Sequence, residues 1–402
     1  MAMRQQMYET ADWVAGALGV AREPLSAPEL VHAAERRTGL ADFGDVAFAE
    51  PLDVLLRAYN VQAALSAFGR IAARWDTVRF LSNLLRLRDA EKTCPAILDQ
   101  AIDGPIFIMG MPRSGSSFLH QLLAQDENNR VVCTWHAIDP SPAGADWHAH
   151  SRAAARKVEG QIRAFVRLAP ELPGLHPIGA HSPQECAEIT GHVFRSLRFD
   201  TTHHVPDYRD WLDTAGHLDA YRFHQRFLKH LQHHLGPGRW ILKCPDHVFA
   251  LDALLAVYPG ARFVFTHRDP LEVLPSVARL TEVLRRPFTR SIDRAKIGRQ
   301  VSERWAAGAA RLIEAAETPA LAERAFHIRF ASFVQDPARW IAALYERFGL
   351  AMGAEFMQRV RDYVAARPAG GYAGQKSDLA SFGLLAPVER RRFDAYTSYF
   401  GV

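Results

Sequence analysis

A loop of glycines and serines follows the apolar segment Ile106–Met109 and leads into a helical pattern that begins at Phe118. Backbone N–H groups of such a loop, together with the positive end of the helix dipole, form an anion site. Compared with the phosphate-binding pattern G-x-x-x-x-G-K-[ST], Gly110–Ser117 supplies both glycines and the final hydroxyl, but Ser116 replaces the lysine and the cation lies at Arg113. The loop therefore disfavours an ordinary ATP or GTP hydrolase and favours a protein that binds another phosphate-bearing donor.

Two further segments accompany this loop along the chain. Arg268 is followed eight residues later by Ser276, and Ile241–His247 reads Ile-Leu-Lys-Cys-Pro-Asp-His. With Pro112–Phe118, these segments resemble the motifs of the sulfotransferases that use 3′-phosphoadenosine 5′-phosphosulfate (PAPS). The first family motif is Pro-(Lys/Arg)-Ser-Gly-(Thr/Ser)-(Thr/Ser)-(Trp/Phe), and bacterial members carry a Leu-Lys-Ser-Pro-x-His element. The resemblance covers roughly residues 100–402 and implies a sulfotransferase whose nucleotide product is adenosine 3′,5′-bisphosphate (PAP).

The resemblance also implies how the first loop holds the donor. Arg113 is placed to stabilise the bridging oxygen as it leaves, and Phe118 faces the adenine. Backbone and hydroxyl donors ligate the 5′-phosphate, and they come from Ser114, Gly115, Ser116 and Ser117. The alternative interpretation is a tight strand-to-helix turn that binds no ligand.

In the second motif, the resemblance assigns Arg268 and Ser276 to the 3′-phosphate. A guanidinium fork and a hydroxyl suit a dianionic group, and a receptor for that phosphate distinguishes PAPS from ATP. The alternative is a surface pair of Arg268 with Asp269, in which Ser276 is merely helical.

A third nucleotide contact is implied by Arg367–Lys376, which resembles the glycine-rich loop that family members close over the 3′-phosphate. On this basis Gly374 and Lys376 are candidate ligands. Bacterial relatives carry a basic residue and a histidine around the last glycine, whereas this chain has Gln375 and Lys376. A plain flexible linker is the competing interpretation.

The proton acceptor for sulfonate transfer has several candidates. His247 matches the histidine of the bacterial element and lies near Lys243, whose ammonium would assist the departing charge. His136 occupies the position where many relatives have a glutamate, and Glu185 with Glu188 forms a third choice. For either histidine the alternative is a hydrogen-bonded structural role.

Histidines also repeat at His230 and His234, four residues apart on one predicted helix face. The glutamate of H-E-x-x-H is absent there and no third ligand follows, so no metal site is expected.

Composition supports an ordinary globular protein with an anionic small-molecule ligand. The 402 residues are 48% hydrophobic and 23% charged with a formal charge of +4, which falls short of a nucleic-acid-binding stripe. Four widely spaced cysteines suit reduced thiols in a cytoplasm, and no run of apolar residues is long enough to predict a membrane span. We therefore expect a cytoplasmic, unanchored protein; the sequence does not indicate its oligomeric state.

The spacing of apolar residues changes near Gly104. Before it, helical spacing predicts an all-helical N-terminal region over residues 1–100, with a capping box at Ser26–Glu29 and a helix end at Gly39. After it, short apolar runs alternate with helical stretches and predict an α/β domain over 101–402, with a parallel sheet flanked by helices. The expected strands contain residues 106–109, 240–242, 263–265 and 326–330. Ligands of such sheets bind beyond the carboxyl ends of the strands, where both phosphate motifs fall.

Residues 141–238 interrupt this pattern with helical, histidine-rich sequence and are interpreted as a substrate cover. The sequence thus predicts an enzyme that moves the sulfonate of PAPS to a hydroxyl of a small, apolar acceptor. A diverged nucleotide-dependent kinase and a non-catalytic nucleotide-binding protein are the alternatives. No pattern in the cover specifies the acceptor.

Overall fold

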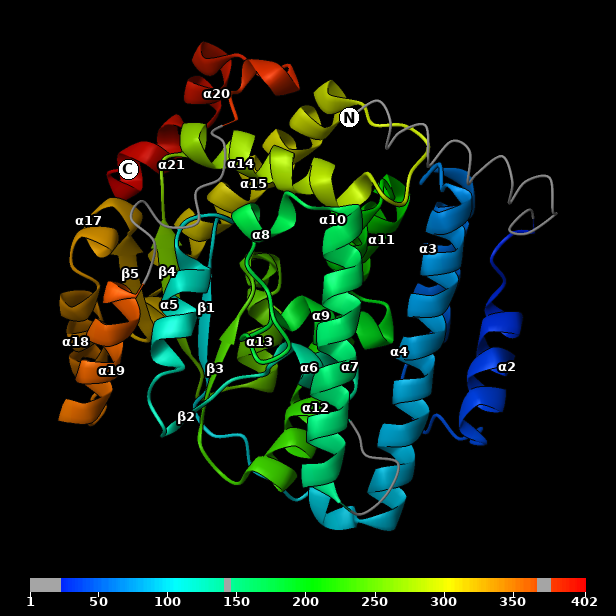
Figure 1. Ribbon diagram of the computed structural model, residues 1–402. Helices are drawn as coiled ribbons and strands as arrows, with labels where there is room; N and C mark the ends of the chain where they lie inside the picture. Colours follow the sequence, from blue (N-terminus) through cyan, green and yellow to red (C-terminus); the bar gives the residue numbers. More distant parts are fainter. Residues whose placement is uncertain (1–22, 141–145, 367–376) are drawn as a thin grey trace.

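A five-stranded parallel sheet forms the centre of the molecule (Figure 1). The computed structural model describes residues 23–140, 146–366 and 377–402. The strand order is β2-β3-β1-β4-β5, so β1 lies between β3 and β4. The strands are β1 (Ile106–Gly110), β2 (Asn129–Arg130), β3 (Arg239–Lys243), β4 (Arg262–His267) and β5 (Ala325–Arg329).

Alternate residues of the buried strand β1 pack against different helices, as the pleat of a strand requires. Ile106 and Ile108 join one apolar cluster with α5 (Ser116–Leu123), α18 (Pro337–Arg347) and α19 (Ala354–Ala365). Phe107 and Met109 join the larger cluster on the other face. That face is covered by α12 (Leu218–Leu235), α13 (Leu251–Val257), α14 (Pro270–Arg285) and α15 (Arg294–Glu317). The sheet is therefore covered on both faces, which explains why its strands read as continuous apolar runs.

The N-terminal region is helical, as predicted, with α2 (Ala27–Thr38), α3 (Ala49–Val61) and α4 (Ala67–Thr93). Gly39 ends α2 in the left-handed conformation, with φ of 73°. The expected capping box is wrong, because the Ser26 side chain makes no capping hydrogen bond. These helices share an apolar cluster with residues of the cover, among them Phe194, Phe199 and Tyr208.

The cover over residues 146–238 is built of helices. They are α7 (Trp147–Leu168), α8 (Leu172–Leu175), α9 (Cys186–Thr190), η2 (Gly191–Val193), α10 (Arg198–Thr202), α11 (Pro206–Ala215) and α12. The short α6 (Thr134–Ile138) precedes them. The remaining helices are η1 (Pro95–Ile97), η3 (Pro245–Phe249), α16 (Pro319–Ala322), α17 (Phe330–Gln335), η4 (Ala380–Phe382), α20 (Ala386–Arg392) and α21 (Asp394–Phe400).

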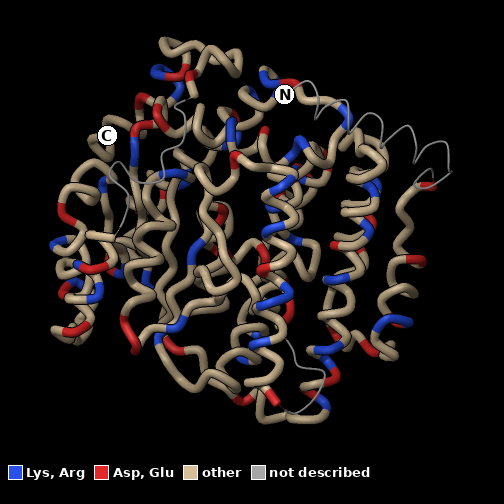
Figure 2. Tube along the Cα trace, viewed as in Figure 1, with Lys and Arg blue, Asp and Glu red and all other residues tan. Residues whose placement is uncertain are grey.

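The predicted α/β class with a parallel sheet is confirmed, and four of its strands lie where apolar runs predicted them. β5 ends at Arg329, so Phe330 begins α17 instead of ending a strand. β2 was not predicted, because two residues are too short to form a pattern. Within the described ranges, no helix has the length and apolar character needed to cross a membrane. Basic and acidic residues are interspersed along the described trace (Figure 2).

Candidate active site

The glycine-serine loop connects β1 to α5 in a tightly constrained path. Gly110 has φ of 140°, and a Cβ there would lie 2.2 Å from the carbonyl oxygen of Thr266 on the neighbouring strand. Gly115 caps α5 with φ of 91°, and Arg113 has φ of 64°, which is costly for a residue with a side chain. The surrounding structure therefore holds the loop in a conformation that is unfavourable for Arg113 and that requires glycine at position 110.

The loop's conformation leaves its backbone donors open. Among the described residues, the N–H groups of Ser114, Gly115, Ser116 and Ser117 find no protein acceptor. They stand at the first turn of α5, where helical N–H groups have no intrahelical partner and the dipole favours an anion. The Ser114 hydroxyl is oriented inward instead, 2.6 Å from Thr266 Oγ1. Its predicted part in anion binding therefore rests on its backbone N–H.

The structure brings Arg113, Arg268 and Ser276 together at the carboxyl ends of β1 and β4. Arg113 Nε donates to Ser276 Oγ at 3.0 Å, and another nitrogen of the same guanidinium donates to the Leu175 carbonyl of α8. Arg268 donates to the Arg113 carbonyl at 2.9 Å and pairs with Glu272. Burial, and then the charge of Arg268, lower the pKa of Arg113. Two neighbouring guanidinium groups give this edge of the sheet a field that attracts anions.

Lys243, at the carboxyl end of β3, contacts both the loop and the cover. Its Nζ donates to Ser117 Oγ at 3.0 Å and forms a short ion pair with Glu185, the residue before α9. Burial opposes ionisation of Glu185, but the charges of Lys243 and His176 and the hydrogen bond from Lys243 together outweigh burial and lower the pKa of Glu185. The site therefore contains a buried ammonium beside the phosphate loop and a carboxylate that stays ionised at neutral pH.

Two more titratable groups lie close to this pair. Burial lowers the pKa of His176 to about 4, and the charges of Glu185, Lys243 and Arg113 act on the same imidazole. Burial and the negative charge of Glu185 raise the pKa of Asp246, in η3, to about 7. Perturbed groups of this kind concentrate at functional sites.

The two predicted histidines lie differently from Glu185. His247 is fully buried; its Nδ1 is 2.5 Å from the Tyr221 hydroxyl, and its ring packs edge-on against Phe107. Burial lowers the pKa of His247 well below its ordinary value. His136 is 5% exposed, accepts the Cys133 N–H and packs against Trp135 in α6, with the two ring planes tilted by 57°. Neither ring shares a described hydrogen bond with Lys243 or with the loop.

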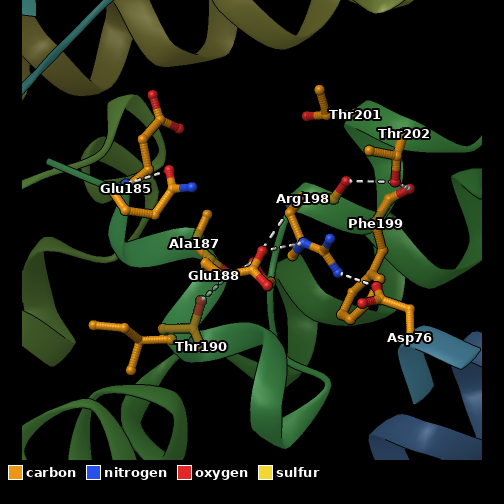
Figure 3. Close-up of polar contacts among 12 residues, drawn as sticks. Asp76, Glu185, Ala187, Glu188, Thr190, Arg198, Phe199, Thr201 and Thr202 are labelled. Atoms are coloured by element: carbon orange, nitrogen blue, oxygen red, sulfur yellow. Dashed lines mark hydrogen bonds and ion pairs between the residues drawn. The ribbon is translucent and has the colours of Figure 1, made fainter. Parts of the chain in front are cut away.

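Glu188 lies one helical turn from Glu185, but the two carboxylates point in different directions (Figure 3). Glu188 pairs with Arg79 of α4 at 2.6 Å and with Arg198 at 2.9 Å. Both arginines also hold Asp76, so Glu188 belongs to an ion-pair network between α4 and the cover. Of the two glutamates predicted as alternatives, the structure joins Glu185 alone to Lys243.

Two other predictions concern the nucleotide ring and the closing loop. Phe118 is 7% exposed and packs against Phe333, which limits the ring face that it can offer to adenine. Gly374 and Lys376 lie outside the described residues.

His230, one of the two histidines four residues apart, forms a hydrogen bond with Glu91 at 3.0 Å. In the described ranges, no group of three or more histidine, cysteine or acidic side chains is arranged to hold a metal ion.

Comparison with known proteins identifies the family. The model of the Sulfotransferase family matches residues 105–353, which is more than half of the chain. The chain belongs to the sulfotransferase family. It is 25% identical over 280 residues to omega-hydroxy-beta-dihydromenaquinone-9 sulfotransferase Stf3 of Mycobacterium tuberculosis (strain CDC 1551 / Oshkosh), covering 65% of this chain and 67% of that protein.

Solved sulfotransferase structures share the fold over nearly the whole length. STF1 from Mycobacterium tuberculosis H37Rv has a TM-score of 0.81 at 28% identity, covering 93% of this chain and 100% of its own. STF9 from Mycobacterium avium has a TM-score of 0.85 at 25% identity, with coverages of 95% and 98%. This sulfotransferase is an enzyme that moves a sulfonate group from a donor, as the sequence predicted.

Sequence reasoning missed two residues of the site. His176 stands between α8 and α9 in no repeating pattern, and only the fold brings it toward Glu185 and Lys243. The guanidinium carbon of Arg268 lies over the Phe330 ring, 4.1 Å from the centre of that ring. A Cβ on Gly115 would lie 2.8 Å from the same ring. Phe330 was expected to end a strand, and its position against both phosphate motifs follows from the start of α17.

Proposed function

We propose that this sulfotransferase uses PAPS as its donor and transfers the sulfonate to a hydroxyl of a small lipophilic acceptor. The observation that carries the donor assignment is the junction of Arg113, Arg268 and Ser276 beside the open N–H groups of the loop. One end of this site suits a 5′-phosphate at a helix N-terminus, and the other suits a second phosphate held by a guanidinium and a hydroxyl.

In the proposed reaction, Lys243 acts on the donor and its ion-pair partner Glu185 acts on the acceptor. PAPS supplies a sulfonate that passes in line from the phosphate oxygen to the acceptor oxygen. Lys243 stabilises the negative charge that develops on the departing side, and Arg113 does so from the loop. Glu185 takes the proton of the acceptor hydroxyl as the new oxygen–sulfur bond forms.

The lipophilic acceptor is supported by the relative whose printed name specifies a hydroxylated dihydromenaquinone. The hydroxyl of such a molecule can be deprotonated by Glu185. Its apolar remainder can be surrounded by the helical cover. The described part of the cover contributes Leu172 and Leu175 next to the carbonyl that holds Arg113. The class of acceptor, and not one compound, is what these features support.

The donor assignment is tested by titrating the enzyme with PAP in a calorimeter, and separately with ADP and magnesium. We expect tight binding of PAP and at least about tenfold weaker binding of ADP, because ADP lacks the 3′-phosphate that Arg268 and Ser276 would hold. A preference for ADP with magnesium would overturn the proposal and favour a nucleotide-dependent kinase.

A further inference from the structure

Phe330, the first residue of α17, contacts both phosphate motifs. The parallel pairing of β4 with β5 ends at His267 and Arg329. The next residues along the two strands, Arg268 and Phe330, are therefore neighbours at the same edge of the sheet, and the guanidinium carbon of Arg268 lies 4.1 Å from the centre of the Phe330 ring. A Cβ on Gly115 of the phosphate loop would lie 2.8 Å from Cδ2 of the same ring. One aromatic side chain thus contacts the loop and the arginine that is assigned to the 3′-phosphate.

A second aromatic residue of α17 fixes this helix against the loop. Phe333 is fully buried, and its ring centre lies 5.3 Å from that of Phe118 in α5. Its spacing of three residues from Phe330 places both rings on one side of α17. A Cβ on Gly115 would lie 3.6 Å from Phe333 as well, so glycine at this position lets both rings pack closely on the loop. The Phe330 ring is therefore held in place by its own helix and not only by Arg268.

The contacts of Arg268 restrict the orientation of its guanidinium group. Nε donates to Glu272 at 2.9 Å, and Nη1 donates to the Arg113 carbonyl oxygen at 2.9 Å. Glu272 is 58% exposed, so its ion pair alone is a weak restraint. A guanidinium group can contact an aromatic ring with its face while its N–H groups donate from its edge. The contact with Phe330 therefore limits the tilt of the group and leaves its hydrogen-bonding edge to acceptors.

We infer that Phe330 is a positioning residue, which holds the Arg268 guanidinium in the orientation that receives the 3′-phosphate of the donor. This inference rests on the proposed use of PAPS. Phe330 has no group that could donate a hydrogen bond to a phosphate, so it acts through Arg268. A side chain that is already held in its binding orientation loses less conformational freedom when the ligand binds. Phe330 should therefore strengthen selectively the binding of nucleotides that carry a 3′-phosphate.

The test compares the binding of PAP with that of adenosine 5′-monophosphate (AMP), which lacks the 3′-phosphate, by calorimetry on the full chain. Phe330→Leu should weaken PAP binding about three- to tenfold, because the cation–π contact of Arg268 is lost, and should change AMP binding less than about twofold. Phe330→Tyr keeps the ring and should bind PAP as the wild type does. Circular dichroism shows whether each variant is folded. Phe330→Met, which fills much of the same space without a ring, should bind both nucleotides as Phe330→Leu does.

Two further variants separate positioning from packing. Phe333→Leu is the matched control, because it makes the same substitution on the same side of α17, at a ring that packs against Phe118 and Gly115. It should lower the thermal stability, and any loss of affinity should be equal for PAP and AMP. In an Arg268→Ala background, Phe330→Leu should weaken PAP binding no further, because the group that the ring orients is absent.

Equal weakening of PAP and AMP binding by Phe330→Leu would overturn the inference, since the ring would then act only by packing on the loop. So would an unchanged preference for PAP over AMP in this variant, or effects of Arg268→Ala and Phe330→Leu that add. These outcomes leave the donor assignment intact. If the wild-type enzyme bound PAP no more tightly than AMP, the donor assignment would fail together with this inference, so the two failures are distinguishable.

Discussion

At the scale of single residues, Glu185 combines two properties that a proton acceptor needs. It is held beside the phosphate loop by Lys243, and it is only partly buried, with 30% of its side chain exposed. His136 and His247 are more deeply buried, and each has its described polar partner elsewhere. Geometry therefore favours the carboxylate over both imidazoles, although imidazole is the commoner base in enzymes.

The variant Glu185→Gln should lower kcat about 10²- to 10⁴-fold, which is the usual contribution of general-base catalysis. PAP affinity should change by less than about threefold, because Lys243 keeps its contact with Ser117. Single-turnover kinetics and calorimetry measure the two quantities. His136→Asn is the comparison, and it should retain most of the wild-type kcat.

The pH dependence tests the same assignment. The pKa of Glu185 lies below its ordinary value of 4.5, so this carboxylate is already ionised above that pH. We expect kcat/KM to be flat between about pH 5 and 7 and to fall only at lower pH, as the carboxylate takes up a proton. A rise through pH 7 would instead assign the base to Asp246, whose pKa is about 7.

Arg268 offers a matched pair of variants for the donor site. Arg268→Ala should raise the KM for PAPS at least about tenfold, because hydrogen bonds to a charged phosphate are lost. Glu272→Gln removes the carboxylate that pairs with Arg268 and should leave this KM unchanged or lower it. Initial-rate kinetics against PAPS distinguish the two. Equal effects from both variants would mean that the pair acts through the start of α14 and not through the donor.

At the scale of elements, the phosphate loop depends on the close approach of β1 and β4. The variant Gly110→Ala should destabilise the enzyme by about 2 kcal/mol or more, because its Cβ would lie 2.2 Å from a backbone carbonyl that cannot rotate away. Gly160→Ala, inside α7, meets no atom within 4 Å and should stabilise the enzyme by about 0.5 kcal/mol. Urea unfolding of both variants measures the difference.

The sequence predicted the positions of the two expected phosphate motifs better than it predicted the surroundings of Lys243. The loop, Arg268 and Ser276 follow buried strands with clear apolar patterns, and parallel strands bring their carboxyl ends to one edge. Glu185 and His176 lie in a cover of short helices without a strong period, so their approach to Lys243 is a tertiary effect that spacing does not encode. The strand β2 was not predicted because its two residues are too short to form a pattern.

At the scale of the whole molecule, the N-terminal helices are joined to the cover by a charged network as well as by apolar packing. Asp76 of α4 pairs with Arg198 of the cover at 2.6 Å, and Glu188 pairs with the same arginine (Figure 3). The guanidinium of Arg198 also lies 5.1 Å from the centre of the Phe80 ring. Because Glu188 lies in α9 and Glu185 is the residue immediately before that helix, this network fixes the segment that carries the proposed base.

Asp76→Asn should therefore destabilise the whole enzyme, by about 2 to 3 kcal/mol at neutral pH, since two arginines lose their shared carboxylate. Burial alone would raise the pKa of Asp76, but the charges of Arg198 and Arg79 outweigh it and lower the pKa below the ordinary 3.8. A lowered pKa in the folded state gives stability that is present above the unfolded value and is lost as the pH falls below it. The difference in unfolding free energy between wild type and variant should accordingly shrink between about pH 5 and pH 3.

Asp210→Asn is the control, because Asp210 is 65% exposed and pairs only with the adjacent Arg209 among the described residues, so its removal should cost less than about 0.5 kcal/mol. Urea unfolding at both pH values, with PAP binding measured on the folded variants, would show whether loosening α9 also weakens the active site; a pH-independent difference would exclude the carboxylate charge as the source of the stability.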